Sequence, residues 1–394
     1  MKQAVETGSS DCSDSAAILR SAPPARARGI YVHVPFCARK CGYCDFYSVV
    51  ADPSVHAAFA ERLIEEARAC GAQVEGPVRT VFVGGGTPTI LGANLWRRII
   101  AALGDAFDLS TLEEFTVEAN PETVAASLLD TLAPGGVNRI SIGAQSFHAR
   151  HLLTLERRHE PENVVRAVGL ARRAGIENIS LDLIFGIPGE TLAEWDAGLD
   201  SALSLHPSHL SCYGLTCEPE TPISRRVASG ALRPVGEGTE AAMYERAIER
   251  LTAACFEHYE ISNFARPGRR CLHNMLYWTG ENVLALGPGA AGHVDGMRWK
   301  NAPDVGAYLR SSGGAPVSEV ERLDPDRSLG ERLMLGLRLI EGAPLEWLDA
   351  ALDPGRRRIV EGLVAEGLLE RTATHLRLTR RGLLVADGVV IELL

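Results

Sequence analysis

The sequence predicts an α/β fold: a partial (β/α)6 barrel of the TIM type, followed by a C-terminal, largely helical, winged-helix-like domain. Between residues 29 and 255, short strand-like apolar segments are followed in turn by amphipathic helical segments. Repeated strand–helix alternation is typical of parallel βαβ units. Polar or glycine-rich residues also follow one predicted strand after another, at the end where a β/α barrel carries its active site.

The first predicted strand, residues 30–34, is a mostly apolar run that Pro35 ends. An amphipathic helix follows at 54–72, with Phe59, Leu63 and Ala67 on one face. The later units continue in the same order up to a sixth strand. We expect strands at 79–83, 114–118, 136–143, 179–185 and 209–215, and helices at 94–106, from 122, at 162–175 and at 191–205.

Each predicted strand has a distinctive residue or cluster at or near its carboxyl end. In chain order these are the cysteines within 37–44, the segment 84–88, Glu118, Gln145, Asp182 and Thr216. One polar strand end could be accidental, but six in succession predict a shared site. Single positions keep alternatives, since Glu118 and Asp182 could cap helices and Gln145 could be a core amide.

Three cysteines lie close together after the first strand, in the pattern C-x3-C-x2-C formed by Cys37, Cys41 and Cys44. Three thiolates can hold three irons of a [4Fe–4S] cluster and leave the fourth iron open to a substrate or cofactor. A structural zinc site needs four ligands, and no second cysteine pair of suitable spacing occurs. The pattern favours a cluster, with zinc or a buried structural role as the alternatives.

The composition, 46% hydrophobic and 23% charged, is that of an ordinary globular protein. A net charge of −10 argues against nucleic acid as the main partner, since phosphate binding requires a basic surface. No apolar run is long enough to span a membrane. Residues 1–28 are rich in Ser, Ala and Pro and lack the apolar core of a signal peptide. We therefore expect a disordered tail on a cytoplasmic protein.

Five motifs in a fixed order, C-x3-C-x2-C, GGGTP, VEANP, SIGAQSF and DLIFGIPGET, resemble those of the radical S-adenosylmethionine (radical SAM) superfamily. Within it the chain is similar to the oxygen-independent coproporphyrinogen III oxidase (HemN)-like family, and most of all to its haem chaperone branch, HemW. The match runs from about residue 30 to the C-terminus. It implies that the three cysteines ligate a [4Fe–4S] cluster whose open iron chelates S-adenosylmethionine (SAM). Electron transfer would then cleave SAM to a 5′-deoxyadenosyl radical.

The resemblance also implies which residues contact SAM. Glycine backbone would lie near the methionyl ammonium, carboxylates would bind the ribose hydroxyls or the ammonium, and Arg157 would pair with the methionyl carboxylate. Taken by itself, Arg157 is equally well explained as a surface charge. The positions that match the family's contacts are Tyr31, Tyr43, Gly85, Gly86, Thr87, Glu118, Gln145, Arg157, Asp182 and Thr216.

Two departures separate the chain from the HemN dehydrogenase. Phe46 stands where that enzyme has a further cysteine, and residues 1–28 offer no counterpart of its long, ordered N-terminal extension. Residues 256–327 instead carry an H-N-x-x-Y-W segment at 273–278, like that of the chaperone branch.

A helix over 273–278 would place His273 and Tyr277 on one face, since they are four positions apart. The segment then offers an axial haem ligand, His273, beside the aromatic rings of Tyr277 and Trp278. The alternative is a buried histidine packed among aromatic residues. His293, expected on a glycine-rich loop, is a second candidate ligand.

The main hypothesis is a haem chaperone that binds haem, a [4Fe–4S] cluster and SAM and delivers haem to an acceptor protein. The alternative is an enzyme that catalyses the radical oxidative decarboxylation of coproporphyrinogen III. Residues 328–394 predict helices followed by a small hairpin, and the acidic net charge favours a lid or docking domain over a DNA-binding one. The expected partners are haem or porphyrinogen and an acceptor, without nucleic acid and without a transmembrane segment.

Overall fold

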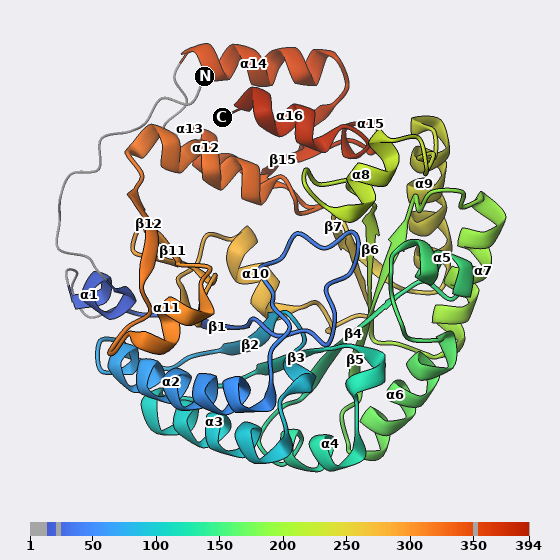
Figure 1. The fold of residues 1–394 in the computed structure, drawn as a ribbon. Coiled ribbons are helices and arrows are strands. Elements are labelled where there is room, and N and C mark those ends of the chain that lie inside the picture. The colour runs from blue at the N-terminus through green and yellow to red at the C-terminus, as the bar shows by residue number, and fades with distance from the viewer. Residues whose placement is uncertain (1–13, 21–24, 350–353, 394) are drawn as a thin grey trace.

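A sheet of twelve strands forms the centre of the molecule, whose structure is a computed structural model that describes residues 14–20, 25–349 and 354–393. The six parallel strands in its middle are β1 (Gly29–Val34), β2 (Thr80–Gly85), β3 (Glu114–Ala119), β4 (Arg139–Gln145), β5 (Asn178–Phe185) and β6 (His209–Gly214). They pair in chain order, which confirms the predicted partial barrel (Figure 1). Each connection brings the chain back to the amino end of the sheet, where the next strand begins, as parallel pairing requires.

Helices cover the outer face of these six strands and bury their apolar sides against it (Figure 1). They are α2 (Pro53–Gly71), α3 (Ala93–Ala106), α4 (Ala126–Leu132), α6 (Pro161–Arg173) and α7 (Leu192–Ser204). The short helix α5 (Ala149–Thr154) and the 3-10 turns η1 (Pro88–Ile90) and η2 (Pro121–Thr123) lie in the connections after the strands. Local sequence sets where several begin: Pro53 and Pro161 occupy early helical positions, and Thr191 forms a capping box with Glu194. None of the helices in the described ranges is both long and apolar enough to cross a membrane.

The sheet extends beyond the six strands at both edges. The elements of this region are α8 (Pro222–Ala228), α9 (Glu237–Ala253), β7 (Glu257–Glu260), β8 (Asn263–Ala265), α10 (Leu272–Trp278), β9 (Val283–Leu286), β10 (Ala291–Val294), β11 (Met297–Asn301), α11 (Val305–Arg310) and β12 (Val317–Arg322). β9 pairs in parallel with β1, and β10 to β12 follow it in antiparallel order. At the other edge β8 pairs with β6, and β7 with β8. No pairing joins β12 to β7 in the described part of the chain, so the barrel is open.

The C-terminal domain has a hydrophobic core of its own and lies above the barrel in Figure 1. Its elements are α12 (Pro325–Gly336), β13 (Ala343–Pro344), α13 (Leu345–Asp349), α14 (Pro354–Ala365), β14 (Leu369–Arg371), β15 (His375–Leu378), α15 (Arg380–Leu383) and α16 (Ala386–Leu393). The three short strands form one small sheet beside the helices, as the winged-helix-like prediction requires. The predicted domain boundary at residue 328 lies within α12.

An ion pair with a buried carboxylate is among the contacts that join this domain to the barrel region. Ile261 donates its backbone N–H to the Arg338 carbonyl at 3.0 Å. The Arg338 guanidinium pairs at 3.3 Å with Glu260, whose side chain is fully buried. The same guanidinium lies 4.6 Å from the centre of the Trp278 ring. Since Trp278 is the last residue of α10, the H-N-x-x-Y-W segment contacts the C-terminal domain.

The start of the described chain differs from the predicted disordered tail. Ser15–Arg20 form helix α1, in which several apolar side chains are buried, and Ala25 forms a bridge with Val74. The prediction of disorder is therefore wrong for residues 14–20 and 25–28, while positions 1–13 and 21–24 lie outside the described residues. The short run A-A-I-L becomes helical because it packs on α2, a contact that composition cannot indicate.

Glu66 of α2 is a fully buried carboxylate that ties distant segments together. It accepts hydrogen bonds from the Gly287 N–H at 2.9 Å and from the Tyr308 hydroxyl at 2.7 Å. The Ser15 hydroxyl of α1 approaches its other oxygen at 3.5 Å. Burial raises the pKa of Glu66 to about 7, although these donors act in the opposite direction.

We expect Glu66→Ala to lower the free energy of unfolding by about 2–4 kcal/mol, because the Tyr308 hydroxyl and the Gly287 N–H lose their buried acceptor. Glu61→Ala is the matched control on the exposed face of the same helix. It should change stability little, since its ion pair with Arg98 is open to solvent. Urea unfolding measures both variants, and equal losses would contradict the structural role of Glu66.

Candidate functional site

The three predicted cluster ligands lie on the loop after β1, and neighbouring segments hold this loop in place. The Cys37 N–H donates to the Val49 carbonyl at 3.0 Å, which closes the loop on itself. The Gly42 N–H donates to the Leu155 carbonyl at 3.2 Å, and the Gly42 carbonyl accepts from the Ile223 N–H at 2.8 Å. The loop is therefore fixed to the barrel, and all three cysteine side chains are half-buried.

Polar groups surround the thiols. The Thr87 hydroxyl donates to the Cys37 Sγ at 3.5 Å, and Arg157 Nη1 donates to the Cys41 Sγ at 3.5 Å. Burial raises the pKa of Cys44 to about 11. Near neutral pH this thiol is therefore protonated, and a bound metal would stabilise its thiolate.

The donor set consists of three sulfur atoms, Cys37, Cys41 and Cys44, on one loop. An iron–sulfur cube takes one thiolate on each iron, so three cysteines can hold three of its four irons. Three sulfur donors on one fixed loop therefore suit the predicted cluster.

The glycine-rich segment after β2 packs directly on the cysteine loop. The Gly86 N–H donates to the Val34 carbonyl at 2.8 Å, and the Thr87 N–H donates to the Phe36 carbonyl at 2.6 Å. A Cβ at Gly86 would lie 2.6 Å from the Phe36 oxygen, which is too close for any side chain. Gly85 has a φ of +101°, a conformation that favours glycine. These glycines are therefore required by packing, besides leaving room for a ligand.

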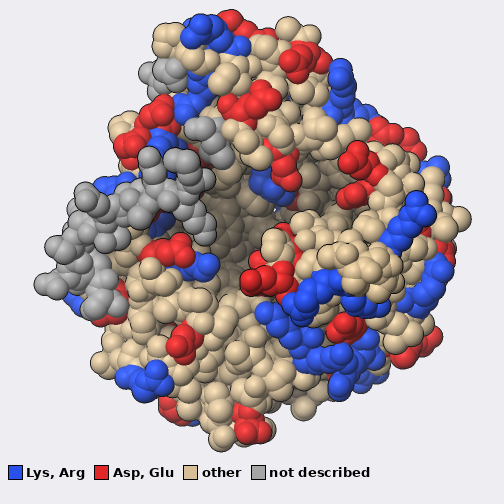
Figure 2. All heavy atoms as spheres, turned by 45° about the horizontal axis from the view of Figure 1, so that its top comes forward, with Lys and Arg blue, Asp and Glu red and all other residues tan. Residues whose placement is uncertain are grey.

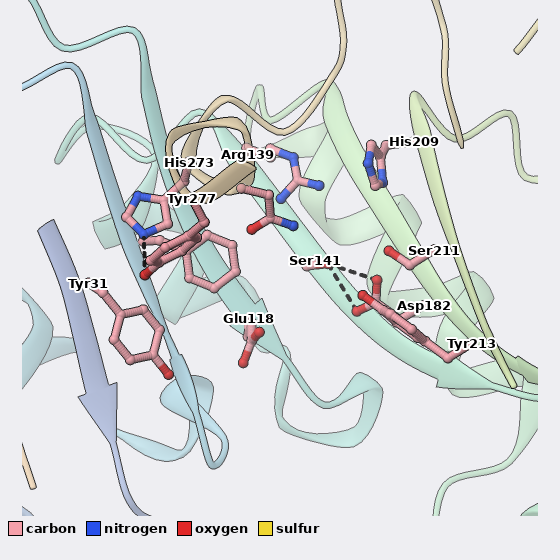
Figure 3. A pocket seen from close by; sticks show the side chains of 12 residues that line it. Tyr31, Glu118, Arg139, Ser141, Asp182, His209, Ser211, Tyr213, His273 and Tyr277 are labelled. Atoms are coloured by element: carbon pink, nitrogen blue, oxygen red, sulfur yellow. Dashed lines mark hydrogen bonds between the residues drawn. The ribbon is translucent and has the colours of Figure 1, made fainter. Parts of the chain in front are cut away.

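Two carboxylates, Glu118 of β3 and Asp182 of β5, face the interior of the barrel (Figure 3). Glu118 accepts a hydrogen bond from the Gly85 N–H at 3.0 Å, and Asp182 accepts from the Ser141 hydroxyl at 3.0 Å. Neither caps a helix, which removes that alternative. Burial raises the pKa of both groups, to about 7 for Glu118, where the charge of Asp182 adds to the rise. A pair of buried carboxylates suits a cationic ligand.

Arg157 links the cysteine loop to the ends of β3 and β4. Its Nη2 donates to the Gly143 carbonyl at 2.6 Å and to Asn120 Oδ1 at 3.3 Å, while Nη1 reaches Cys41. The side chain therefore belongs to the site and is not the solvated surface charge of the alternative. Gln145 ends β4 in a left-handed conformation, with a φ of +61°.

The remaining predicted SAM contacts are placed unequally. Tyr43 packs beside the cysteines in a small apolar cluster with Leu155 and Ile187, and Tyr31 lines the barrel interior. Thr216 follows the carboxyl end of β6 and is exposed. Of the predicted SAM contacts, Tyr31, Glu118 and Asp182 line the cavity, and the others lie outside its lining.

The six strands enclose a cavity of about 220 Å³ (Figure 3). Tyr213, 41% exposed, lies at its open end, the carboxyl side of β6. Helix α10 contributes the lining at the other end. The lining residues are Tyr31, Phe82, Glu118, Arg139, Ser141, Asp182, His209, Ser211, Tyr213, His273, Asn274 and Tyr277.

Helix α10 closes the amino end of the strands. Glu114, the first residue of β3, accepts hydrogen bonds from the N–H groups of Leu272 and His273 at 2.9 and 3.2 Å. Thr80, the first residue of β2, contacts the His273 ring. The H-N-x-x-Y-W segment therefore lies at the opposite end of the strands from the cysteine loop.

The His273 imidazole is buried, with both ring nitrogens engaged. Nδ1 lies 2.8 Å from Thr80 Oγ1, Nε2 lies 3.3 Å from the Tyr277 hydroxyl, and the ring stacks on Phe82. Burial, assisted by the charge of Arg139, lowers the pKa of His273 to about 3. The ring is therefore neutral near pH 7, the form that ligates metals. Ligation through Nε2 would first require the Tyr277 contact to break.

The other two haem candidates lie elsewhere. Trp278 is not among the cavity residues, and Arg338 covers its ring. His293 is not on a loop, as predicted, but in strand β10, opposite Arg298 of β11. The glycines of this segment form the turns before and after the strand, which explains the error.

Part of the cavity lining was missed from the sequence. Arg139 and Ser141 of β4, like His209 and Ser211 of β6, face the interior at alternate positions, as a strand requires. This period of two is visible in the sequence, but only the spatial arrangement of the six strands shows that the polar face points inward.

Comparisons with known proteins agree with this geometry. Residues 31–202 match the radical SAM superfamily, and residues 323–385 match the HemN C-terminal domain. The haem chaperone HemW of Mycobacterium tuberculosis is 38% identical over 378 residues, which cover 94% of this chain and 96% of the relative. HemW of Escherichia coli is 34% identical over 374 residues, with 92% and 96% covered. The solved structure of E. coli coproporphyrinogen III oxidase (HemN) shares the fold, with a TM-score of 0.84 at 21% identity over 96% of this chain and 92% of that chain.

Replacing Cys37, Cys41 or Cys44 by Ser should abolish the iron–sulfur absorption of the reconstituted protein, because each thiolate would hold a different iron. Serine variants of the buried Cys212 and the exposed Cys255 are the controls and should keep it. Iron and sulfide analysis checks both sets. A Cys41→Ser protein that retains about four irons per chain would refute the assignment.

SAM binding should strengthen as the pH rises through the Glu118 pKa of about 7. Above that pH the carboxylate is ionised, and the ionised form attracts a cationic ligand more strongly than the protonated form. Calorimetric titration on both sides of this pH gives the profile. Glu118→Gln should bind SAM more weakly and lose most of the pH dependence, which also corrects for titration of the ligand itself. Identical profiles in the two proteins would rule out this role for Glu118.

Proposed function

The chain belongs to the HemW family of haem chaperones within the radical SAM superfamily, and from this membership we propose that it binds haem, a [4Fe–4S] cluster and SAM and delivers haem to an acceptor protein in the cytoplasm. The observation that carries the proposal is the cysteine loop. It holds three half-buried thiols at the carboxyl end of the strands, beside a glycine turn and two buried carboxylates.

Each part of this site has a proposed role. Cys37, Cys41 and Cys44 would hold the cluster, and the glycine turn with Glu118 and Asp182 would hold SAM above the cavity. When bound, the two groups supply one-electron chemistry. Arg157 reaches Cys41 and places positive charge next to the thiolates, and the two carboxylates would balance the positive charges of SAM.

Phe46 favours the chaperone over the decarboxylase alternative. It occupies the position where the resemblance places a further cysteine in the dehydrogenase, and the residue is 69% exposed on the cysteine loop. It supplies no thiol for metal, proton or radical chemistry at that position.

Haem ligation by His273 requires an opened form of the protein. The cavity of about 220 Å³ is smaller than the roughly 300–1,000 Å³ of pockets for drug-sized ligands, and haem is larger than most such ligands. In the proposed ligation, α10 moves, and His273 Nε2 exchanges its contact with Tyr277 for the iron. Tyr277 would keep a stacking role, while Trp278 would remain at the joint with the C-terminal domain.

The C-terminal domain is placed to act as a lid. Figure 2 shows the surface deeply hollowed between this domain and the barrel. The open end of the cavity, marked by Tyr213, lies at the carboxyl ends of the strands, which carry the cysteine loop. We propose that haem approaches through this hollow and that the domain covers it or docks the acceptor.

Haem titration of four variants tests the proposed ligand. Wild-type protein should bind about one haem per chain, and His273→Ala should lower the affinity about tenfold or more, the effect expected of a lost anchoring contact. Tyr277→Phe keeps the ring but frees Nε2, so it should raise the affinity for haem dimethyl ester, which has no free carboxylate that could use the Tyr277 hydroxyl. His206→Ala, an exposed histidine outside the cavity, is the control. If His273→Ala still binds haem with the wild-type affinity, another residue ligates the iron. His293→Ala then tests the next candidate.

Anaerobic incubation with coproporphyrinogen III, SAM and a reductant separates the two functions. A chaperone should yield no protoporphyrinogen, because the site lacks the dehydrogenase's further cysteine at Phe46. Chromatography of the porphyrin products gives the answer. Sustained decarboxylation by the reconstituted protein would establish the enzyme and reject the chaperone proposal.

A further inference from the structure

Arg139, the first residue of β4, is a buried cation that the proposed function does not use. It lines the cavity between the side chains of α10 and those of β6, and only 2% of the residue is exposed (Figure 3). A guanidinium stays charged at every pH that a folded protein tolerates. The barrel therefore holds a permanent positive charge near the amino ends of its strands.

This charge has almost no close partner in the protein. Nη1 donates to Thr116 Oγ1 at 3.4 Å, and Nε is buried without an acceptor. Within the described residues no carboxylate forms an ion pair with Arg139, and Glu114 and Asp182 attract it only at longer range. Buried charges are normally paired, because an unpaired one is strongly destabilising. The free N–H groups of Arg139 therefore indicate a ligand that accepts hydrogen bonds.

Two further donors lie on α10 beside the same space. Asn274 lines the cavity, and its side-chain amide has no hydrogen-bond partner in the described ranges. The Tyr277 hydroxyl also lines it, and its contact with His273 Nε2 is long, at 3.3 Å. A guanidinium, an amide and a phenol directed at one space form a set of donors suited to an anion.

The cavity favours a carboxylate over a phosphate. Its volume of about 220 Å³ admits a small ligand or one arm of a larger one. Glu118 and Asp182 line the same cavity, so they would repel a dianion more strongly than a monoanion. A carboxylate also matches the two parallel N–H groups of a guanidinium.

We propose that Arg139, Asn274 and Tyr277 form a carboxylate-binding subsite at the floor of the barrel cavity. Two kinds of ligand carry this group: a free small carboxylate, or a tetrapyrrole with a propionate arm. The second kind rests on the proposed function, whereas the subsite itself does not.

Titration of the reconstituted protein with sodium propionate, followed by ligand-detected NMR, tests the subsite directly. Arg139→Met should bind propionate about 10- to 100-fold more weakly than wild type, the range expected for charge-assisted hydrogen bonds. Arg139→Lys keeps the charge and should recover part of the binding. Replacing a buried charge by an apolar side chain commonly preserves folding, and Asn274→Ala removes a donor without changing any charge. Arg98→Met, on the outer surface, is the matched control and should bind as wild type does.

Haem and its dimethyl ester distinguish the two kinds of ligand. If a propionate arm is the ligand, Arg139→Met should lower the affinity for haem by a similar factor and leave the affinity for the ester unchanged. If a free carboxylate is the ligand, only propionate binding falls.

Two results have opposite consequences for the two proposals. The subsite proposal would be overturned if haem affinity were unchanged and propionate binding were either absent or equal in wild type, Arg139→Met and Asn274→Ala. A wild-type protein that binds propionate but no haem would contradict the proposed function and leave the subsite standing.

Discussion

The hydrogen bonds between the cysteine loop and the glycine turn after β2 are the constraint on which the site depends. Gly86 and Thr87 donate to the carbonyls of Val34 and Phe36, and this approach leaves no space for a side chain at Gly86. Parallel pairing of β1 with β2 places the two loops side by side, because parallel strands end at the same edge. Backbone packing therefore sets the position of the three thiols relative to Glu118, before any cofactor binds.

The interior of the barrel combines this constraint with an uneven distribution of charge. A β/α barrel normally fills its interior with layers of branched apolar side chains, whereas polar and aromatic residues here enclose a cavity. Glu118 and Asp182 lie toward the carboxyl end of the cavity. Arg139 is the first residue of β4 and so lies toward the amino end. Charges in a buried site are costly unless a partner balances them. Cationic and anionic groups of ligands can balance the two ends, which couples ligand binding to the stability of the barrel.

The H-N-x-x-Y-W segment connects this cavity to the C-terminal domain. Glu114 fixes the start of α10, His273 closes the amino end of the cavity, and Trp278 lies under the Arg338 guanidinium. Arg338 in turn pairs with the buried Glu260. A movement of α10 would therefore also disturb its contact with the C-terminal domain.

Patterns between neighbours in the sequence were sufficient to predict the six strands, the cysteine loop and the shared face of His273 and Tyr277. These features depend on periodicity, on proline and glycine, and on cysteine spacing, all of which act over a few residues. The strand at His293 and the helix within the supposed N-terminal tail depended on contacts with distant segments. So did the inward direction of Arg139 and the cover that Arg338 places over Trp278. The sequence by itself thus determined the strands and indicated candidate residues for the chemistry, whereas the tertiary structure alone decided which side chains share a cavity, because that depends on how distant segments pack.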